Sequence, residues 1–239
     1  LGSFLGSMIG WRGAFFCIVP IAIMALLWQL KSMPSLPVLN TQQKSGHAFS
    51  LLKRPVVLLG MLGVLFLFMG QFALFTYLRP FLENVTMVNT NMLSTLLLIL
   101  GLAGLVGTFV ISHILHAHVY RYLFFIPIGM ALVATALVFF GHQIWIVALL
   151  MAIWGFIGTS APVAWNTWLT RTLPHDAELG GGLMVAIIQL AITLGATLGG
   201  VLFDAQGYQS TFIFSASILV LSAIFSLLTW RHLLHVKYQ

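Results

Sequence analysis

The sequence predicts an all-α, multi-pass membrane protein with seven transmembrane helices. Its 239 residues are 60% hydrophobic and only 6% charged, whereas soluble globular domains carry about 25% charged residues. The mean hydropathy is +1.06. The apolar runs are long enough for bilayer-spanning helices of about 17–25 residues, and they exceed the roughly 10 residues of a barrel strand. Soluble enzyme folds are therefore excluded.

The spans can be placed in order along the chain. The first apolar run covers residues 13–30, and Trp11 and Arg12 at its entry are typical of the membrane interface. Residues 31–54 then form a polar segment with two prolines, which predicts a linker between two bundles. Six further spans are expected at residues 55–78, 92–112, 122–141, 144–168, 181–203 and 211–230.

The distribution of basic residues predicts the orientation of the chain. With residues 31–54 in the cytoplasm, the basic residues Arg12 and Arg79 lie outside, and the remainder lie inside. The inside set comprises Lys31, Lys44, Lys53, Arg54, Arg121, Arg171, Arg231 and Lys237. This positive-inside bias predicts a cytoplasmic C-terminus. The same residues are scattered along the chain without an aromatic-basic pattern, so no nucleic-acid partner is expected.

Polar side chains within the apolar runs predict an internal cavity, because an amide in contact with lipid is costly. Gln71 and Tyr77 lie toward the end of the span at 55–78, and Gln189 lies near the middle of the span at 181–203. Trp154, Trp165 and Asn166 occupy the span at 144–168, where they would present aromatic and amide groups to a flat or polyhydroxylated solute. The alternative interpretation for these residues is helix packing and interfacial anchoring, which we favour for Trp168.

Other side chains favour structural roles. Ala191, Gly195 and Gly199 form a small-residue row that predicts close helix packing. The hydroxyl stripe of Ser215, Ser222, Ser226 and Thr229 predicts packing with hydroxyls bonded back to their own helix. Similar packing is predicted for Gly101, Gly104, Thr108 and Ser112.

Features of catalysis and ion chemistry are sparse. The four acids, Glu83, Asp176, Glu178 and Asp204, all fall in predicted loops, so none is an obvious intramembrane proton carrier. His113, His116 and His118 have no carboxylate or cysteine nearby, and no metal or other cofactor is expected. The sequence contains no nucleotide-binding or nucleophile motif, so we do not expect an enzyme.

The order of these features resembles the major facilitator superfamily, in its drug/proton antiporter branch. Residues 70–80, 165–171 and 185–191 are similar to segments of purine-ribonucleoside and sugar efflux permeases in that branch. Residues 2–16 resemble the end of the family's fifth helix and the start of its sixth. The loop at 112–121 departs from the family's basic motif because it lacks an aspartate, and only Arg121 resembles the motif.

The resemblance implies a division of the chain. Residues 1–30 would be the end of helix five and helix six of an incomplete N-terminal bundle, residues 31–54 the cytoplasmic central loop, and residues 55–239 the C-terminal six-helix bundle. The chain is thus expected to be a C-terminal fragment whose partner is the missing N-terminal bundle. The implied function is proton-coupled export of a small polar solute across the cell inner (plasma) membrane by alternating access. An uptake symporter, a non-transporting membrane protein and a truncated inactive fragment are the alternatives.

Overall fold

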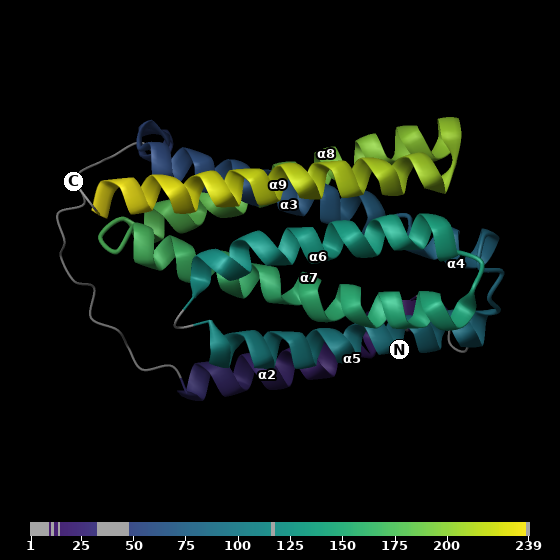
Figure 1. Ribbon diagram of the computed structural model, residues 1–239. Helices are drawn as coiled ribbons and strands as arrows, with labels where there is room; N and C mark the ends of the chain where they lie inside the picture. Colours follow the sequence, from purple (N-terminus) through teal and green to yellow (C-terminus); the bar gives the residue numbers. More distant parts are fainter. Residues whose placement is uncertain (1–9, 11, 14, 33–47, 116–117, 238–239) are drawn as a thin grey trace.

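The structure is a computed structural model that describes residues 10, 12–13, 15–32, 48–115 and 118–237, with side chains described as far as Leu234. The described residues form a bundle of long helices joined by short connections (Figure 1). The elements are α2 (Ile18–Ser32), the 3-10 helix η1 (Ala48–Lys53), α3 (Pro55–Phe75), α4 (Leu78–Asn84), α5 (Thr90–Ile114), α6 (Val119–Phe140), α7 (Ile144–Thr172), α8 (Ala177–Gln206) and α9 (Tyr208–Lys237).

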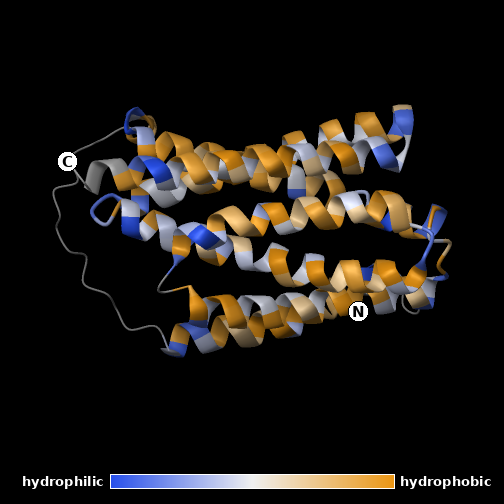
Figure 2. Cartoon of the chain, viewed as in Figure 1, coloured by the Kyte–Doolittle hydropathy of each residue, from blue (hydrophilic) through white to orange (hydrophobic). Residues whose placement is uncertain are grey.

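The membrane character predicted from the sequence is confirmed. Six helical segments are long and apolar enough to cross a bilayer, and they correspond to the six spans expected after the linker. Apolar residues cover these helices along most of their length, and hydrophilic residues gather at the two ends of the bundle (Figure 2). The first predicted span corresponds to α2, which has 15 residues and is shorter than the others.

Several helix boundaries differ from the expected ones, and α9 runs past the expected residue 230 to Lys237. The span expected to reach residue 78 ends at Phe75, and α4 follows as a separate short helix. Pro80 has no amide hydrogen to donate to the carbonyl of Thr76, which weakens the helical hydrogen bonding between α3 and α4. Conversely, α8 extends beyond the predicted residues 181–203 at both ends, because its polar terminal turns continue the helix outside the apolar run.

Two helices, α3 and α7, organise the packing. α3 packs mainly against α9 and α8, while α7 packs mainly against α5 and α6. The contact of α3 with α8 uses Gly195 and Gly199, whose added β-carbons would collide with the backbone of Met69 and Ala73. The packing role predicted for this small-residue row is therefore confirmed.

The hydroxyl stripe on α9 bonds across to a neighbouring helix. Ser215 Oγ donates to the carbonyl oxygen of Gly70 at 2.6 Å, and Ser222 Oγ donates to that of Gly63 at 2.8 Å. Both serines are buried. The prediction of packing is confirmed, but the prediction of bonding within their own helix is wrong for these two residues. Glycines at positions 63 and 70 let α9 approach α3 closely enough for the hydroxyls to reach another backbone.

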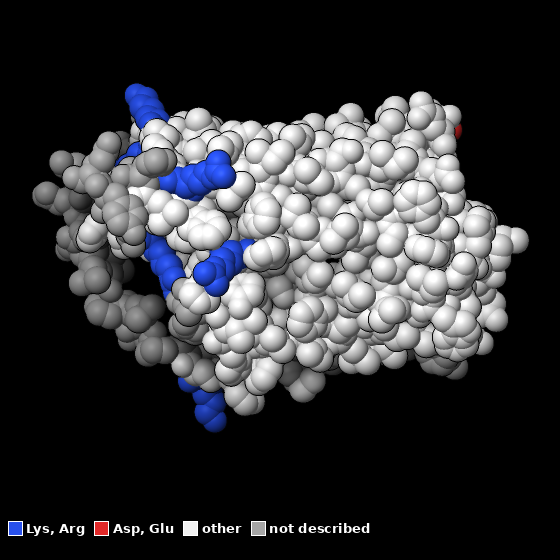
Figure 3. Space-filling view, in the orientation of Figure 1, with Lys and Arg blue, Asp and Glu red and all other residues white. Residues whose placement is uncertain are grey.

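Basic side chains gather at one end of the bundle, on the left in Figure 3. We call this the basic end and define it by Arg54, Arg121, Arg171 and Arg231. Arg54 Nη1 lies 3.2 Å from Asp176 Oδ2, which joins the start of α3 to the start of α8. Beyond the other end of α3, Arg79 Nε lies 2.9 Å from Glu83 Oε1. Both pairs are partly exposed, and exposed pairs contribute about 0–1 kcal/mol each.

Candidate functional site

Gln71 lies on α3 at the edge of a cavity that separates α3 from α7. The cavity has a volume of ≈ 160 Å³. We call it the Gln71 cavity, and its lining residues are Gln71, Phe72 and Phe75 of α3, Leu100 of α5, and Trp154, Gly155, Gly158 and Thr159 of α7. Gln71 Oε1 is buried and has no hydrogen-bond partner among the described residues. Burying such an acceptor without a partner costs about 1–3 kcal/mol, so a ligand group or water that donates to it would be favoured.

The turn of α7 opposite Gln71 is shaped by Gly158 and Pro162. A β-carbon added to Gly158 would lie 3.3 Å from Gln71 Nε2, so glycine leaves the room that the amide occupies. Pro162 lies inside α7 and has no amide hydrogen for the carbonyl of Gly158. The carbonyl of Gly158 thus lacks its usual intrahelical donor.

Of the other predicted site residues, the structure brings only Trp154 to this cavity. Its side chain is 3% exposed, packs in the bundle core and presents part of its surface to the cavity. Thr159 also lines the cavity, but its hydroxyl already donates to the carbonyl oxygen of Gly104 at 2.7 Å. The polar group available in the Gln71 cavity is therefore the carboxamide of Gln71.

Trp165 and Trp168 pack against α3 nearer to the basic end. The Trp165 indole covers Gly63 and the Trp168 indole covers Gly60, and the two indoles meet edge to face with centroids 5.3 Å apart. Trp165 is 1% exposed and Trp168 is fully buried. The packing favoured for Trp168 is therefore confirmed, but interfacial anchoring is wrong, because the missing side chain of Gly60 leaves a place for the indole inside the bundle. Neither indole Nε1 has a hydrogen-bond partner among the described residues.

Tyr77 connects the end of α3 to α8. Its hydroxyl donates to the carbonyl oxygen of Ala196 at 3.0 Å, and its ring stacks on Phe203 with centroids 5.1 Å apart. A β-carbon on Gly200 would overlap the tyrosine hydroxyl. These contacts fix the side chain against α8 and away from the Gln71 cavity. Its predicted contact with substrate stays a prediction.

Asn166 and Gln189 lie on exposed faces of α7 and α8. The hydroxyl of Thr170 donates to the backbone carbonyl oxygen of Asn166, and that of Thr193 donates to the backbone carbonyl oxygen of Gln189. Neither amide side chain lines the Gln71 cavity. The sequence correctly identified polar groups within the spans, but the structure does not gather them into one site. Their proposed roles in substrate contact stay predictions.

Sequence reasoning missed the apolar lining of the cavity. Phe75 lies four residues after Gln71, the spacing that places two side chains on the same helix face. Leu100 and Gly155 meet where α5 and α7 approach closely, since a β-carbon on Gly155 would collide with the Leu100 carbonyl. The spacing of Phe75 could have been recognised from the sequence, whereas the contact between α5 and α7 could not.

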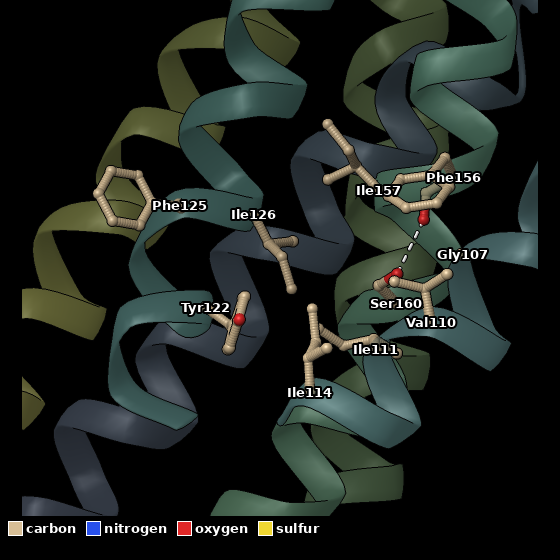
Figure 4. A pocket seen from close by; sticks show the side chains of 10 residues that line it. All are labelled: Gly107, Val110, Ile111, Ile114, Tyr122, Phe125, Ile126, Phe156, Ile157 and Ser160. Carbon is tan, nitrogen blue, oxygen red and sulfur yellow. Dashed lines mark hydrogen bonds between the residues drawn. The ribbon is translucent and has the colours of Figure 1, made fainter. Parts of the chain in front are cut away.

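A second cavity, of ≈ 220 Å³, lies nearer to the basic end between α5, α6 and α7 (Figure 4). Its walls are mainly apolar, with Ile111, Ile126 and Phe156 among the lining residues. The hydroxyl of Ser160 points toward its own helix and donates to the carbonyl oxygen of Phe156 at 2.8 Å. None of the predicted site residues lines this cavity, and its chemistry does not favour a polar solute.

The acidic residues lie near helix ends. Asp176 is the residue before α8, while Glu83, Glu178 and Asp204 lie within helices, so their expected placement in loops is wrong. The helices continue past the apolar runs from which their ends were predicted. None of the four acids lines the Gln71 cavity. The described residues therefore place no carboxylate at the candidate site.

The fold and the cavity define a multi-pass membrane protein with a polar group held between its helices. The sequence profile of the Major Facilitator Superfamily matches residues 1–177 and 92–233, and the chain belongs to this superfamily. The predicted family membership is thereby confirmed.

Individual relatives align over nearly the whole chain. This chain is 50% identical over 234 residues to the "Transcription regulatory protein OpdE" of Pseudomonas aeruginosa. The alignment covers 97% of this chain and 58% of that protein. The chain is 40% identical over 224 residues to the "Purine ribonucleoside efflux pump NepI" of Salmonella paratyphi B, covering 94% of this chain and 56% of that protein. NepI of Salmonella typhimurium gives the same identity and coverage. The chain thus spans little more than half the length of these curated relatives.

Proposed function

We propose that the chain is part of a secondary active exporter of small polar solutes, with nucleosides or sugars ahead of lipophilic compounds. The observation that carries the proposal is the side chain of Gln71, which lines a cavity beside Trp154 and whose buried Oε1 has no partner among the described residues. An amide acceptor beside an indole offers a hydrogen bond and an aromatic surface to the same solute. Membership of the Major Facilitator Superfamily and the efflux named for the NepI relatives support a role in export.

The size of the cavity supports a site completed by another part of the protein. Complete small-molecule sites enclose roughly 300–1,000 Å³, whereas the Gln71 cavity has ≈ 160 Å³. The described residues would therefore supply one side of the substrate path. In this proposal Tyr77, Trp165, Asn166 and Gln189 contact the solute in other states of an alternating-access cycle. Residues 1–30 belong to the opposing N-terminal bundle, 31–54 to a cytoplasmic linker and 55–239 to the C-terminal bundle.

The energy source in this proposal is a proton gradient, and the C-terminus is cytoplasmic in a cell inner membrane. The basic end supports this orientation, because cytoplasmic segments carry an excess of lysine and arginine. All four acids lie near helix ends and outside the Gln71 cavity. We therefore expect the proton-carrying group to lie outside the described residues.

Two other functions compete with export. An uptake symporter of the same fold would use the same cavity, and it differs only in the direction of net transport. A non-transporting regulatory membrane protein is favoured by one observation, the name "Transcription regulatory protein" carried by the 50% identical relative. A truncated, inactive product would also lack transport.

Vesicle transport separates these functions. The full-length protein expressed from its gene is placed in inverted and right-side-out membrane vesicles, and labelled purine ribonucleosides and sugars are followed across an imposed proton gradient. The exporter is expected to accumulate solute in inverted vesicles only when the interior is acidic. Accumulation only in right-side-out vesicles would establish the symporter, and no transport by well-expressed protein would favour a regulatory or inactive protein.

A further inference from the structure

A pocket of ≈ 330 Å³ lies at the basic end, where α6, α7 and α9 meet. We call it the basic pocket, and its lining residues are His118, Val119, Tyr120, Arg121, Arg171, Trp230, Leu233 and Leu234. The pocket is remote from the Gln71 cavity, with which it shares no lining residue. The proposed export function therefore assigns it no role.

Positive charge reaches the pocket from two helices. Arg121 lies in the first turn of α6, and Arg171 lies in the last turn of α7. The N-terminus of α6 adds its partial positive charge, and His118 at its N-cap makes no side-chain hydrogen bond to the first turn. The C-terminus of α7 carries a partial negative charge of about one half of an elementary charge. The two positive charges of Arg121 and Arg171 are larger than this. None of the four acids is among the described residues that line the pocket.

The other side of the pocket is apolar. α9 contributes Leu233, Leu234 and the partly exposed indole of Trp230. Tryptophan is enriched at the level of lipid headgroups, where its ring contacts the acyl region and its N–H remains near water. A pocket that is cationic on one side and apolar on the other fits a molecule with an anionic head and a hydrocarbon body.

We propose that the basic pocket binds the phosphate of an anionic phospholipid from the leaflet at this end of the bundle. Arg121 and Arg171 would hold the phosphate oxygens, because guanidinium forms paired hydrogen bonds to such groups. Leu233, Leu234 and Trp230 would contact the glycerol and the upper acyl chains. Basic pockets between transmembrane helices are suited to this class of ligand. A lipid bound here would hold the ends of α6, α7 and α9 together.

Lipid binding to the purified full-length protein tests the proposal. Delipidated protein is titrated with phosphatidylglycerol or phosphatidylcholine, and retained lipid is counted by native mass spectrometry. Wild-type protein is expected to prefer phosphatidylglycerol. Arg121→Gln and Arg171→Gln are each expected to lower that preference about fivefold, the effect of removing one basic group near an anionic lipid. Arg231→Gln is the matched control, because Arg231 is exposed at the same end and does not line the pocket.

Three outcomes would overturn the proposal: equal retention of both lipids, an unchanged preference in both pocket variants, or an equal loss in the Arg231→Gln control. Displacement of the lipid by millimolar inorganic phosphate would also overturn it, by showing a site for the free anion. Should a pocket variant fail to fold, the wild-type protein is labelled with a photoreactive phosphatidylglycerol. Adducts are expected on Val119, Leu233 or Leu234, and adducts confined to other helices would contradict the assignment.

Discussion

The Gln71 amide lies against Gly158 on the opposing helix, 3.3 Å from the position a β-carbon would take there. This proximity leaves little room for a larger side chain at position 158. It also makes the glutamine sensitive to a change on a helix to which it does not belong. The Cε of Met130 lies 3.5 Å from the same position, so an added methyl group would be confined from two sides.

The first prediction follows from that contact. In the full-length protein, Gly158→Ala is expected to displace the Gln71 carboxamide and to weaken solute binding about two- to tenfold, the value of one hydrogen bond of about 0.5–1.5 kcal/mol. The apparent KM for transport measures this. Gly182→Ala is the control, since nothing lies within 4 Å of its added β-carbon. An unchanged KM in Gly158→Ala, at normal expression, would show that the position of the Gln71 amide does not affect solute binding.

The second prediction concerns the close approach of α5 and α7. A β-carbon on Gly107 would collide with the backbone carbonyl of Phe156, which cannot move without separating the two helices. Gly107→Ala is expected to destabilise the protein by about 1–3 kcal/mol, the usual cost of overpacking. Thermal unfolding of the full-length protein in detergent measures the effect. Gly101→Ala, on the same helix with nothing within 4 Å, should be no less stable than the wild type.

The third prediction concerns the serines that join α9 to α3. Ser222→Ala removes the donor to the Gly63 carbonyl, and we expect a loss of stability of about 0.6 kcal/mol, the average for bonds between helices in a membrane. Ser217→Ala is the control, because that exposed hydroxyl donates within its own helix, to Ile213. Equal melting temperatures for Ser222→Ala and wild type, with a resolution of a few tenths of a degree, would refute this contribution.

The fourth prediction concerns orientation. Because arginine gathers at the basic end, we expect a green fluorescent protein fused after Gln239 to fluoresce and alkaline phosphatase fused there to be inactive. Whole-cell fluorescence and phosphatase activity give the readout. Active phosphatase at this position would reverse the proposed topology and place the basic pocket in the outer leaflet.

The membrane-spanning architecture could be predicted from the sequence because it depends on local properties. Each apolar run is long enough to cross the bilayer by itself, and Gly195 and Gly199 mark a packing face by their spacing alone. The helix ends were predicted less accurately from apolar runs alone. The apolar run of α3 continues past Phe75, whereas the helix ends there.

The grouping of the site residues could not be predicted in the same way. Gln71 and Trp154 line one cavity because α3 and α7 come together, a contact between segments distant in sequence. Trp168 stands near Arg171 at the end of an apolar run, which favours the interface. Its burial depends on the space above Gly60 on another helix. The sequence identifies which side chains are polar or aromatic, and the packing decides which of them share a cavity.

Gln71→Ala shows whether the Gln71 carboxamide contacts the transported solute, as we propose. Concentration-dependent uptake of labelled purine ribonucleosides and sugars into inverted vesicles is compared for wild type, Gln71→Ala and the exposed control Gln143→Ala. We expect Gln71→Ala to raise the apparent KM about two- to tenfold and Gln143→Ala to match wild type. Identical kinetics in all three proteins, at equal expression, would contradict it.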